Sequence, residues 1–205
     1  MRKLELAEIQ QIELEIFDAF VRLCKQHGLS YQLAYGSLLG AVRHQGFIPW
    51  DDDIDVVLPR PDYDRLLSTF TEKTDHYLLE SPYTGNADYY YTYAKLYDTD
   101  TTLTEKTKRN CRRGIYIDVF PLDGIGRDEG EMEANFAKID RLNMFLMTRT
   151  CAIRKDRSFY KNAAIALSRL VPSFLVKDRE LVVKVDKLAA SFAYTHVAQR
   201  AVTSV

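Results

Sequence analysis

The chain has 205 residues, of which 46% are hydrophobic and 28% are charged, and its formal net charge at neutral pH is −1. This length suits one domain with a core, or one domain with an appended part, and the balanced charge excludes general nucleic-acid binding through a basic surface. The three cysteines lie far apart and the four histidines are scattered, which excludes a disulfide framework and a zinc site built from Cys and His.

No run of apolar residues approaches the ~18 that a membrane-spanning helix requires. The N-terminal sequence Met-Arg-Lys-Leu-Glu-Leu-Ala-Glu carries acidic residues where a signal peptide would be apolar. We therefore expect a cytoplasmic protein without a transmembrane segment, and peripheral contact with the inner face of the membrane stays open.

An amphipathic helix over residues 4–27 is the first element that the sequence predicts. Apolar residues recur there at three- and four-residue spacing, and Gly28 follows at the position of a C-terminal cap. The apolar face is expected to pack on a sheet. Its residues are Ile9, Ile12, Ile16, Phe20 and Leu23.

A short strand over residues 29–35 and a short helix over residues 38–44 are expected to flank the turn Gly36-Ser37. Backbone amides at the start of a helix, together with the Ser37 hydroxyl, can hold a phosphate oxygen. The alternative is that Ser37 is only the N-cap of the helix. Arg43, near the end of this helix, is placed either to bind a diphosphate or to pair with a nearby aspartate.

Carboxylates and apolar residues alternate over Asp53–Leu58, which predicts a strand. Successive strand residues face opposite sides, so Asp53 and Asp55 share one face, and Asp51 joins them if the strand extends that far back. Two carboxylates about 4 Å apart repel by roughly 4 kcal/mol at an effective dielectric constant near 20. A bound Mg²⁺ or Mn²⁺ would remove this repulsion, and the alternative is a solvated turn. Trp50, just before, is expected to be a packing residue.

A second strand-forming stretch is dense in tyrosine. Alternation over residues 89–97 places five side chains on one face, namely Tyr89, Tyr91, Tyr93, Lys95 and Tyr97. Lys95 is expected either to meet a phosphate or to lie on a solvent-facing edge strand. The basic run over residues 106–113 is expected to be a solvated loop, with contact to an anionic substrate as the alternative.

A single carboxylate, Asp118, interrupts the apolar stretch Ile115–Leu122. This stretch predicts a buried strand, in which an unpaired carboxylate would be costly. Asp118 therefore needs a partner, which is either a basic residue such as Arg43 or Arg112, or a metal ion. Asp123, beyond Pro121, is expected in a turn.

After Gly130 the composition changes to helix formers, and helices are expected over residues 128–151, 159–170 and 174–193. No chemistry is legible in this part. We expect residues 1–125 to form a catalytic core with its N-terminal helix, and residues 126–205 to form a helical region packed on that core.

The Gly36-Ser37 turn followed by Asp-x-Asp is the outline of the nucleotidyltransferase superfamily. The longer run Leu-Leu-Gly-Ala-Val-Arg-His-Gln-Gly-Phe-Ile-Pro-Trp-Asp-Asp-Asp-Ile-Asp is more specific and resembles the LicD family, whose members include phosphocholine transferases that act on cell-surface glycans. The stretches Lys-Leu-Tyr-Asp-Thr and Ile-Asp-Val-Phe-Pro-Leu-Asp resemble further family segments. Over about residues 29–125, the resemblance implies an α/β fold with a nucleotidyltransferase-like mixed β-sheet flanked by helices, and a helical C-terminal part.

The resemblance also implies a reaction, the transfer of phosphocholine from CDP-choline to a sugar hydroxyl of a teichoic acid or lipopolysaccharide, with release of CMP. The implied catalytic and metal-binding residues are Asp53, Asp55 and Asp118, with Asp51 as a further ligand of Mg²⁺ or Mn²⁺. Asp118 would also orient or deprotonate the acceptor hydroxyl, and the tyrosine face would hold the quaternary ammonium by cation–π contact. The implied substrate-binding residues are Gly36, Ser37, Arg43 and Lys95.

Two alternatives stay open. One is a transferase of another phospho-alcohol, such as phosphoribitol or phosphoethanolamine, from the corresponding CDP-alcohol donor to a lipid-linked glycan, because the metal site would be the same. The other is a truncated or divergent member that binds nucleotide without turnover. It is suggested because LicD relatives usually continue with an acidic and aromatic segment, whereas this sequence stops at Val205.

Overall fold

The computed structural model describes residues 3–70, 76–86, 88–104, 112–126, 128–172, 176–191 and 199–201. It divides into two compact units. The first comprises Met1–Ser81, Tyr93–Leu103 and Arg113–Leu122, and the second comprises Pro82–Thr92, Thr104–Arg112 and Asp123–Val205. The units are thus interleaved in sequence, unlike the single boundary expected after residue 125. Packing of the C-terminal region on the core stays a prediction.

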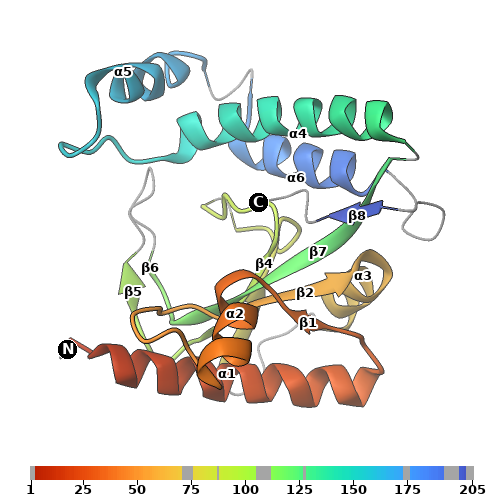
Figure 1. Cartoon of the computed structure of the whole chain (residues 1–205). Coiled ribbons are helices and arrows are strands. Elements are labelled where there is room, and N and C mark those ends of the chain that lie inside the picture. Colours follow the sequence, from red (N-terminus) through yellow and green to blue (C-terminus); the bar gives the residue numbers. More distant parts are fainter. Residues whose placement is uncertain are drawn as a thin grey trace. The chain divides into compact units, whose positions relative to one another are not determined.

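A mixed β-sheet organises the first unit, with the strand order β1-β2-β7-β4-β3. The parallel pair is β2 with β7, and the other neighbouring strands are antiparallel. This sheet, flanked by helices, confirms the expected fold class (Figure 1). The strands are β1 (Gln32–Leu33), β2 (Asp55–Pro59), β3 (Tyr77–Glu80), β4 (Ala94–Asp98) and β7 (Tyr116–Gly126), of which β7 continues into the second unit.

The first unit also contains α1 (Leu6–His27), α2 (Tyr35–His44) and α3 (Arg60–Thr69). The structure confirms the predicted N-terminal helix, which ends at Gly28 in a left-handed conformation with φ 60°. The helix α2 begins at Tyr35 and therefore includes the Gly36-Ser37 turn that was expected to precede it. β1 is accordingly shorter than the predicted strand.

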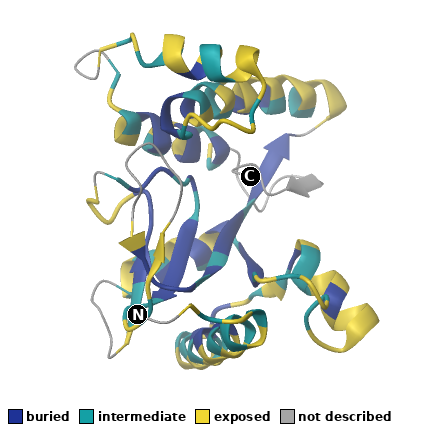
Figure 2. Cartoon of the chain, turned by 90° about the vertical axis from the view of Figure 1, so that its left-hand side faces the viewer, coloured by how far each residue is buried: buried dark blue, intermediate teal, exposed yellow. Residues whose placement is uncertain are grey.

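One face of the sheet packs on α1 and α3 to form the core of the first unit. Apolar side chains of α1, such as Ile16 and Phe20, meet alternate residues of the central strands, and these strands are buried along most of their length (Figure 2). Burying each such side chain contributes roughly 1.5–3 kcal/mol. The alternate strand residues in this core are Val56, Leu58, Leu96, Ile117 and Val119. The residues between them therefore point to the opposite face.

Among its described residues, the second unit contains three helices, in the three stretches where the composition predicted them. These are α4 (Glu129–Thr150), α5 (Phe159–Ser168) and α6 (Asp178–Ala189). Asp128 is the N-cap of α4, and its carboxylate accepts a hydrogen bond of 2.9 Å from the Glu131 amide. The end of β7 pairs with β8 (Gln199–Ala201), a strand that the sequence did not predict.

Several expectations about the strands are wrong. The tyrosine-rich strand begins only at Ala94, so residues 89–93 do not alternate across a sheet. Asp123 lies inside β7 with 0% of its surface exposed, instead of in a turn. Of the basic run, residues 106–111 lie outside the described residues, and the rest is β6 (Arg112–Arg113), which pairs with β5 (Leu103–Thr104). Among the described residues, no helix is both long enough and apolar enough to cross a membrane.

Candidate active site

Charged side chains form a row across the sheet, on the face opposite α1. Asp55 of β2 is in register with Asp118 of β7, Asp118 is in register with Lys95 of β4, and Lys95 is in register with Glu80 of β3. The Lys95 Nζ lies 2.5 Å from an Asp118 carboxylate oxygen. Arg113 ends the row, with its Nε 2.7 Å from Glu80. Residues that are far apart in the sequence thus meet in one line.

Lys95 is the partner that the buried-strand argument required for Asp118. Lys95 is 1% exposed and lies on an interior strand, so the expectation that it lies on a solvent-facing edge strand is wrong. The expectation that Arg43 or Arg112 pairs with Asp118 is also wrong, because Lys95 forms that ion pair. Its ammonium group lies 3.5 Å from the ring centroid of Tyr116, a cation–π contact. The Tyr93 hydroxyl donates a long hydrogen bond of 3.5 Å to the other oxygen of Asp118.

The acidic segment Asp51–Ile54 has no regular secondary structure, because β2 begins only at Asp55. Alternation along a strand therefore does not place Asp53, although that was the argument from sequence. The carboxylates of this segment nonetheless interact electrostatically with each other and with Asp118. Burial and then the charges of Asp51 and Asp118 raise the pKa of Asp53 to about 6. Burial and then the charges of Asp53 and Asp118 raise the pKa of Asp55 to about 7, against a smaller opposing effect of Lys95.

Ser37 connects α2 to this segment. Its hydroxyl accepts a hydrogen bond of 2.8 Å from the Asp55 amide and donates one of 3.4 Å to the carbonyl of Asp53. The N-cap of α2 is Ala34, so the expectation that Ser37 caps the helix is wrong. Ser37 instead fixes the backbone on both sides of Ile54.

The start of α2, where a phosphate site was predicted, lies against the carboxylate of Asp51. A Cβ atom added at Gly36 would stand 2.7 Å from an Asp51 carboxylate oxygen, so only glycine allows this approach. A negative charge is favourable at this end of a helix. Gln10 of α1 holds the same segment through a hydrogen bond of 2.8 Å from its Nε2 to the Asp51 carbonyl.

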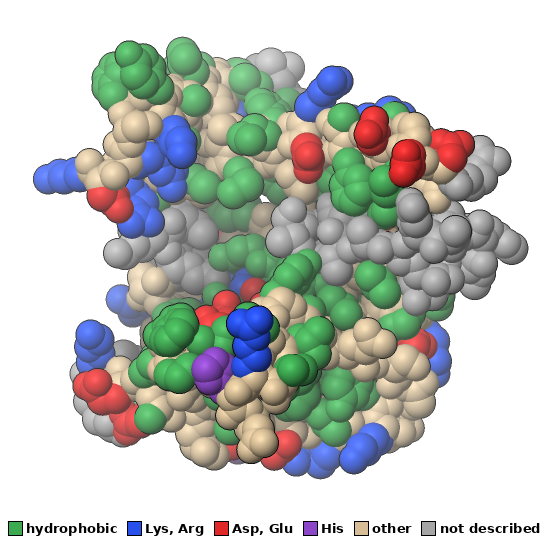
Figure 3. Space-filling view, in the orientation of Figure 1, with side chains coloured by type: hydrophobic (Ala, Val, Ile, Leu, Met, Phe, Trp, Pro, Cys, Tyr) green, Lys and Arg blue, Asp and Glu red, His purple; other side chains and the backbone are tan. Residues whose placement is uncertain are grey.

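Arg43 lies in the last turn of α2 and is exposed. Within the part of the chain that the structure describes, it forms no ion pair, so the expected pairing with an aspartate is not observed. Trp50 is 78% exposed and is therefore not the packing residue that was expected. Basic and hydrophobic side chains share the surface of the molecule where α2 lies (Figure 3).

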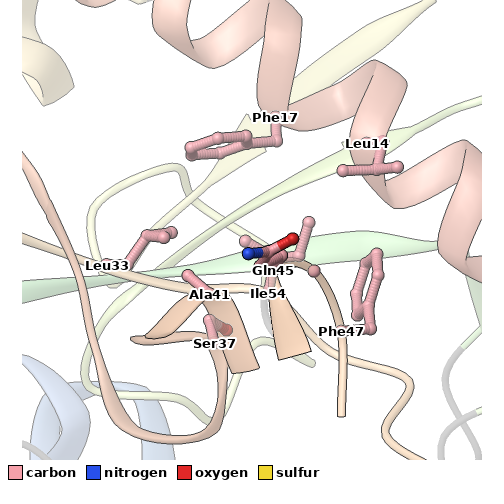
Figure 4. Close-up of a pocket in the computed structure, with 9 residues that line it drawn as sticks. Leu14, Phe17, Leu33, Ser37, Ala41, Gln45, Phe47 and Ile54 are labelled. Carbon is pink, nitrogen blue, oxygen red and sulfur yellow. The ribbon is translucent and has the colours of Figure 1, made fainter. Parts of the chain in front are cut away.

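An apolar pocket of about 240 Å³ lies beside Ser37, between α1 and the chain around α2 (Figure 4). Because its walls are almost entirely apolar, it does not suit a phosphate group. Its lining residues include Leu14, Phe17, Leu33, Phe47 and Ile54.

The donor set has the chemistry of a site for a hard divalent cation. It offers carboxylate oxygens, and burial, followed by the charges of neighbouring aspartates, raises the pKa of both Asp53 and Asp55. Among the described residues, however, no three acidic, histidine or cysteine side chains stand close enough to hold an ion as they are. The residues therefore fit a cation by charge and ligand type, and the carboxylates would have to close around it.

Comparison with known proteins identifies the same part of the chain. Residues 28–151 match the family described as "LicD/FKTN/FKRP, nucleotidyltransferase domain". A stretch of 126 residues, 61% of this chain, is 40% identical to "Lipopolysaccharide cholinephosphotransferase LicD" of Haemophilus influenzae, of which it spans 47%. An uncharacterized protein of Rickettsia prowazekii is 48% identical over 40 residues, which is 20% of this chain and 15% of that protein. No solved structure matches the chain.

Proposed function

Because the chain belongs to the LicD/FKTN/FKRP nucleotidyltransferase family, we propose that it transfers phosphocholine from CDP-choline to a sugar hydroxyl of a cell-surface glycan. The observation that supports this proposal most directly is the pair Asp55 and Asp118, which lie in register on neighbouring strands. Lys95 lies beside them, and all three residues belong to the segment that matches the family. The similarity to the Haemophilus cholinephosphotransferase supports phosphocholine as the transferred group. It covers about half of that protein, so the activity of the whole relative is part of the proposal.

Asp53, Asp55 and Asp118 would hold Mg²⁺ or Mn²⁺, with Asp51 as a further ligand. The cation would polarise the diphosphate of the donor and offset charge on the leaving CMP. Lys95 supplies a buried positive charge next to Asp118, and it would offset charge on the transferred phosphoryl group. Asp118 would orient the acceptor hydroxyl, or take its proton.

Ser37 contributes by fixing the backbone of the acidic segment, in addition to any contact with phosphate. Gly36 contributes by leaving room for Asp51 at the start of α2. Arg43, exposed on the same helix, would bind the diphosphate.

An aromatic cluster beside the carboxylates supports choline over an uncharged alcohol. The Phe120 ring packs against Tyr93, with centroids 4.3 Å apart, and against Tyr35, with centroids 5.7 Å apart. Tyr35 is 49% exposed and has a positive φ of 45°, an unusual backbone conformation for a residue other than glycine. Aromatic faces near carboxylates attract a quaternary ammonium, whereas ribitol carries no positive charge.

The acceptor in this proposal is a lipid-linked glycan of the lipopolysaccharide or teichoic acid type, reached from the cytoplasmic face of the membrane. Similarity to the lipopolysaccharide cholinephosphotransferase of Haemophilus influenzae supports lipopolysaccharide as the acceptor.

A donor comparison tests the proposed function. The purified chain is incubated with CDP-choline, CDP-ethanolamine or CDP-ribitol, a glycan acceptor and Mg²⁺, and mass spectrometry measures CMP and modified glycan. We expect turnover with CDP-choline, and its loss in EDTA and in the Asp55→Asn variant. Faster turnover of CDP-ribitol would instead identify the chain as a phosphoribitol transferase. Binding of CDP-choline without release of CMP would identify an inactive member and overturn the proposal.

A further inference from the structure

Glu13 occupies a position on α1 where an apolar residue would be expected. It lies on the buried face of the helix with Ile16 and Phe20, and it is 2% exposed. Within the described residues, its Oε2 is fully buried and has no hydrogen-bond partner. Burying such a group without a partner opposes folding. A residue that served only for packing would be apolar, so the carboxyl group needs another explanation.

The acidic segment of the candidate active site provides that explanation. The charges of Asp52, Asp53, Asp118 and Asp51 all act on Glu13 and, after burial, they raise its pKa to about 9. Three residues earlier on α1, Gln10 donates its hydrogen bond to the Asp51 carbonyl. Residues three apart on a helix share a face. Gln10 thus contacts the acidic segment, and Glu13 lies on the same side of α1 and interacts electrostatically with the aspartates of that segment.

We propose that Glu13 is a positioning residue of the active site, whose carboxyl group supports the segment Asp51–Asp53 when Asp51 and Asp53 close around a cation. A protonated carboxyl group has an O–H donor and a free acceptor oxygen, so it can bond the segment without adding negative charge to the cluster. Gln10 fixes the segment at Asp51, and Ser37 fixes it at Asp53 and Asp55. Glu13 would supply a further hydrogen bond to the segment from the buried face of α1. This inference rests on the proposed function, because it requires the aspartates to hold a cation.

Two substitutions of Glu13 distinguish a role in supporting the acidic segment from a role in packing. Glu13→Gln keeps the shape and both hydrogen-bonding capacities, whereas Glu13→Met keeps the approximate shape and removes them. The exposed Glu15 on the same helix provides matched controls, Glu15→Gln and Glu15→Met. Calorimetry measures the affinity for Mn²⁺ alone, a thermal melt without metal measures stability, and release of CMP from CDP-choline measures turnover.

We expect Glu13→Met to melt at or above the wild-type temperature and to lose about tenfold or more in Mn²⁺ affinity and in turnover, the size of effect seen when groups behind metal ligands are removed. Glu13→Gln should stay within about twofold of wild type for both, because it preserves the hydrogen bonds. The two Glu15 variants should change neither.

Wild-type Mn²⁺ affinity in Glu13→Met would overturn the inference. An unfolded Glu13→Met protein would also overturn it, because the carboxyl group would then serve the fold. Equal losses in Glu13→Gln and Glu13→Met would exclude support through hydrogen bonds. If the wild type itself neither binds Mn²⁺ nor releases CMP, the proposed function fails and the inference falls with it.

Discussion

Asp55 of β2 lies directly opposite Asp118 of β7 in the parallel register of the sheet. Two carboxylates on neighbouring strands repel each other, and like charges directly opposite destabilise a sheet. Lys95 forms an ion pair with Asp118 but lowers the pKa of Asp55 less than the neighbouring aspartates raise it. At the start of β2 the neighbouring aspartates thus repel Asp55 more than Lys95 attracts it, and this is where the proposed cation would bind.

Replacing one carboxylate of this cluster should remove activity without loss of stability. We expect Asp53→Asn and Asp55→Asn each to lower turnover by about 10²–10³-fold and to melt at or above the wild-type temperature, because each removes a repulsive charge. Steady-state kinetics in Mg²⁺ and a thermal melt in EDTA measure the two effects. The exposed Asp52 offers the control variant Asp52→Asn. Full activity in both Asp53→Asn and Asp55→Asn would contradict their assignment as ligands.

The stability of the metal-free protein should fall as pH rises. Folding raises the pKa of Asp53 and Asp55 from 3.8 to about 6 and about 7, and that of Glu13 from 4.5 to about 9. The folded state thus binds these protons more tightly than the unfolded state. The resulting stability is complete at pH below the pKa values of the unfolded state, and it is lost as the pH rises through the pKa values of the folded state.

Calorimetry in EDTA between about pH 5 and pH 9 measures this loss, over the window that these raised pKa values define. Mg²⁺ should restore more stability near pH 8 than near pH 5, because it competes with protons for the carboxylates. Asp53→Asn and Asp55→Asn should each flatten the profile. A melting temperature that increases steadily over this range without metal would contradict the assignment of unbalanced charge.

Features with local sequence signals were predicted correctly, whereas contacts made through long-range strand pairing were missed. The N-terminal helix was legible because its apolar spacing and Gly28 are local signals. The partner of Asp118 was not, since Lys95 reaches it only through the antiparallel register of β4 and β7. Glu80 and Glu13 were missed for the same reason. An acidic residue on an otherwise apolar helix face was the one available signal for Glu13.

Removing Lys95 should destabilise the protein strongly. Lys95→Met removes the buried ammonium group that pairs with the partly buried Asp118, and breaking a buried pair costs up to about 3–5 kcal/mol. Urea denaturation measures the free energy of unfolding. The double variant Lys95→Met, Asp118→Asn should recover much of the loss. Lys177→Met, which breaks an exposed pair with Glu180, should change stability by less than about 1 kcal/mol. A similarly small effect of Lys95→Met would contradict the importance of the buried pair.

Glycine at position 36 should be required for the site and not for the fold. In Gly36→Ala the added Cβ would lie 2.7 Å from the Asp51 carboxylate, so that carboxylate must move away. We expect turnover and Mn²⁺ affinity to fall by about tenfold or more, with a small change in melting temperature. Gly46→Ala is the matched control, because an added Cβ there meets nothing within 4 Å. Equal behaviour of the two variants would argue against a role for the Asp51 position.

Ser37 should contribute to stability through the acidic segment. Its hydroxyl is the acceptor for the Asp55 amide, and Ser37→Ala leaves that partly buried amide without this partner. We expect a loss of about 1 kcal/mol in the free energy of unfolding, measured by urea denaturation, and weaker Mn²⁺ binding because Asp53 and Asp55 lose their common support. Ser68→Ala is the control, since among the described residues its hydroxyl bonds only the Arg65 carbonyl of its own helix, and it should change stability by less than about 0.5 kcal/mol. Unchanged stability of Ser37→Ala with weaker binding of CDP-choline alone would instead identify the hydroxyl as a direct contact to phosphate.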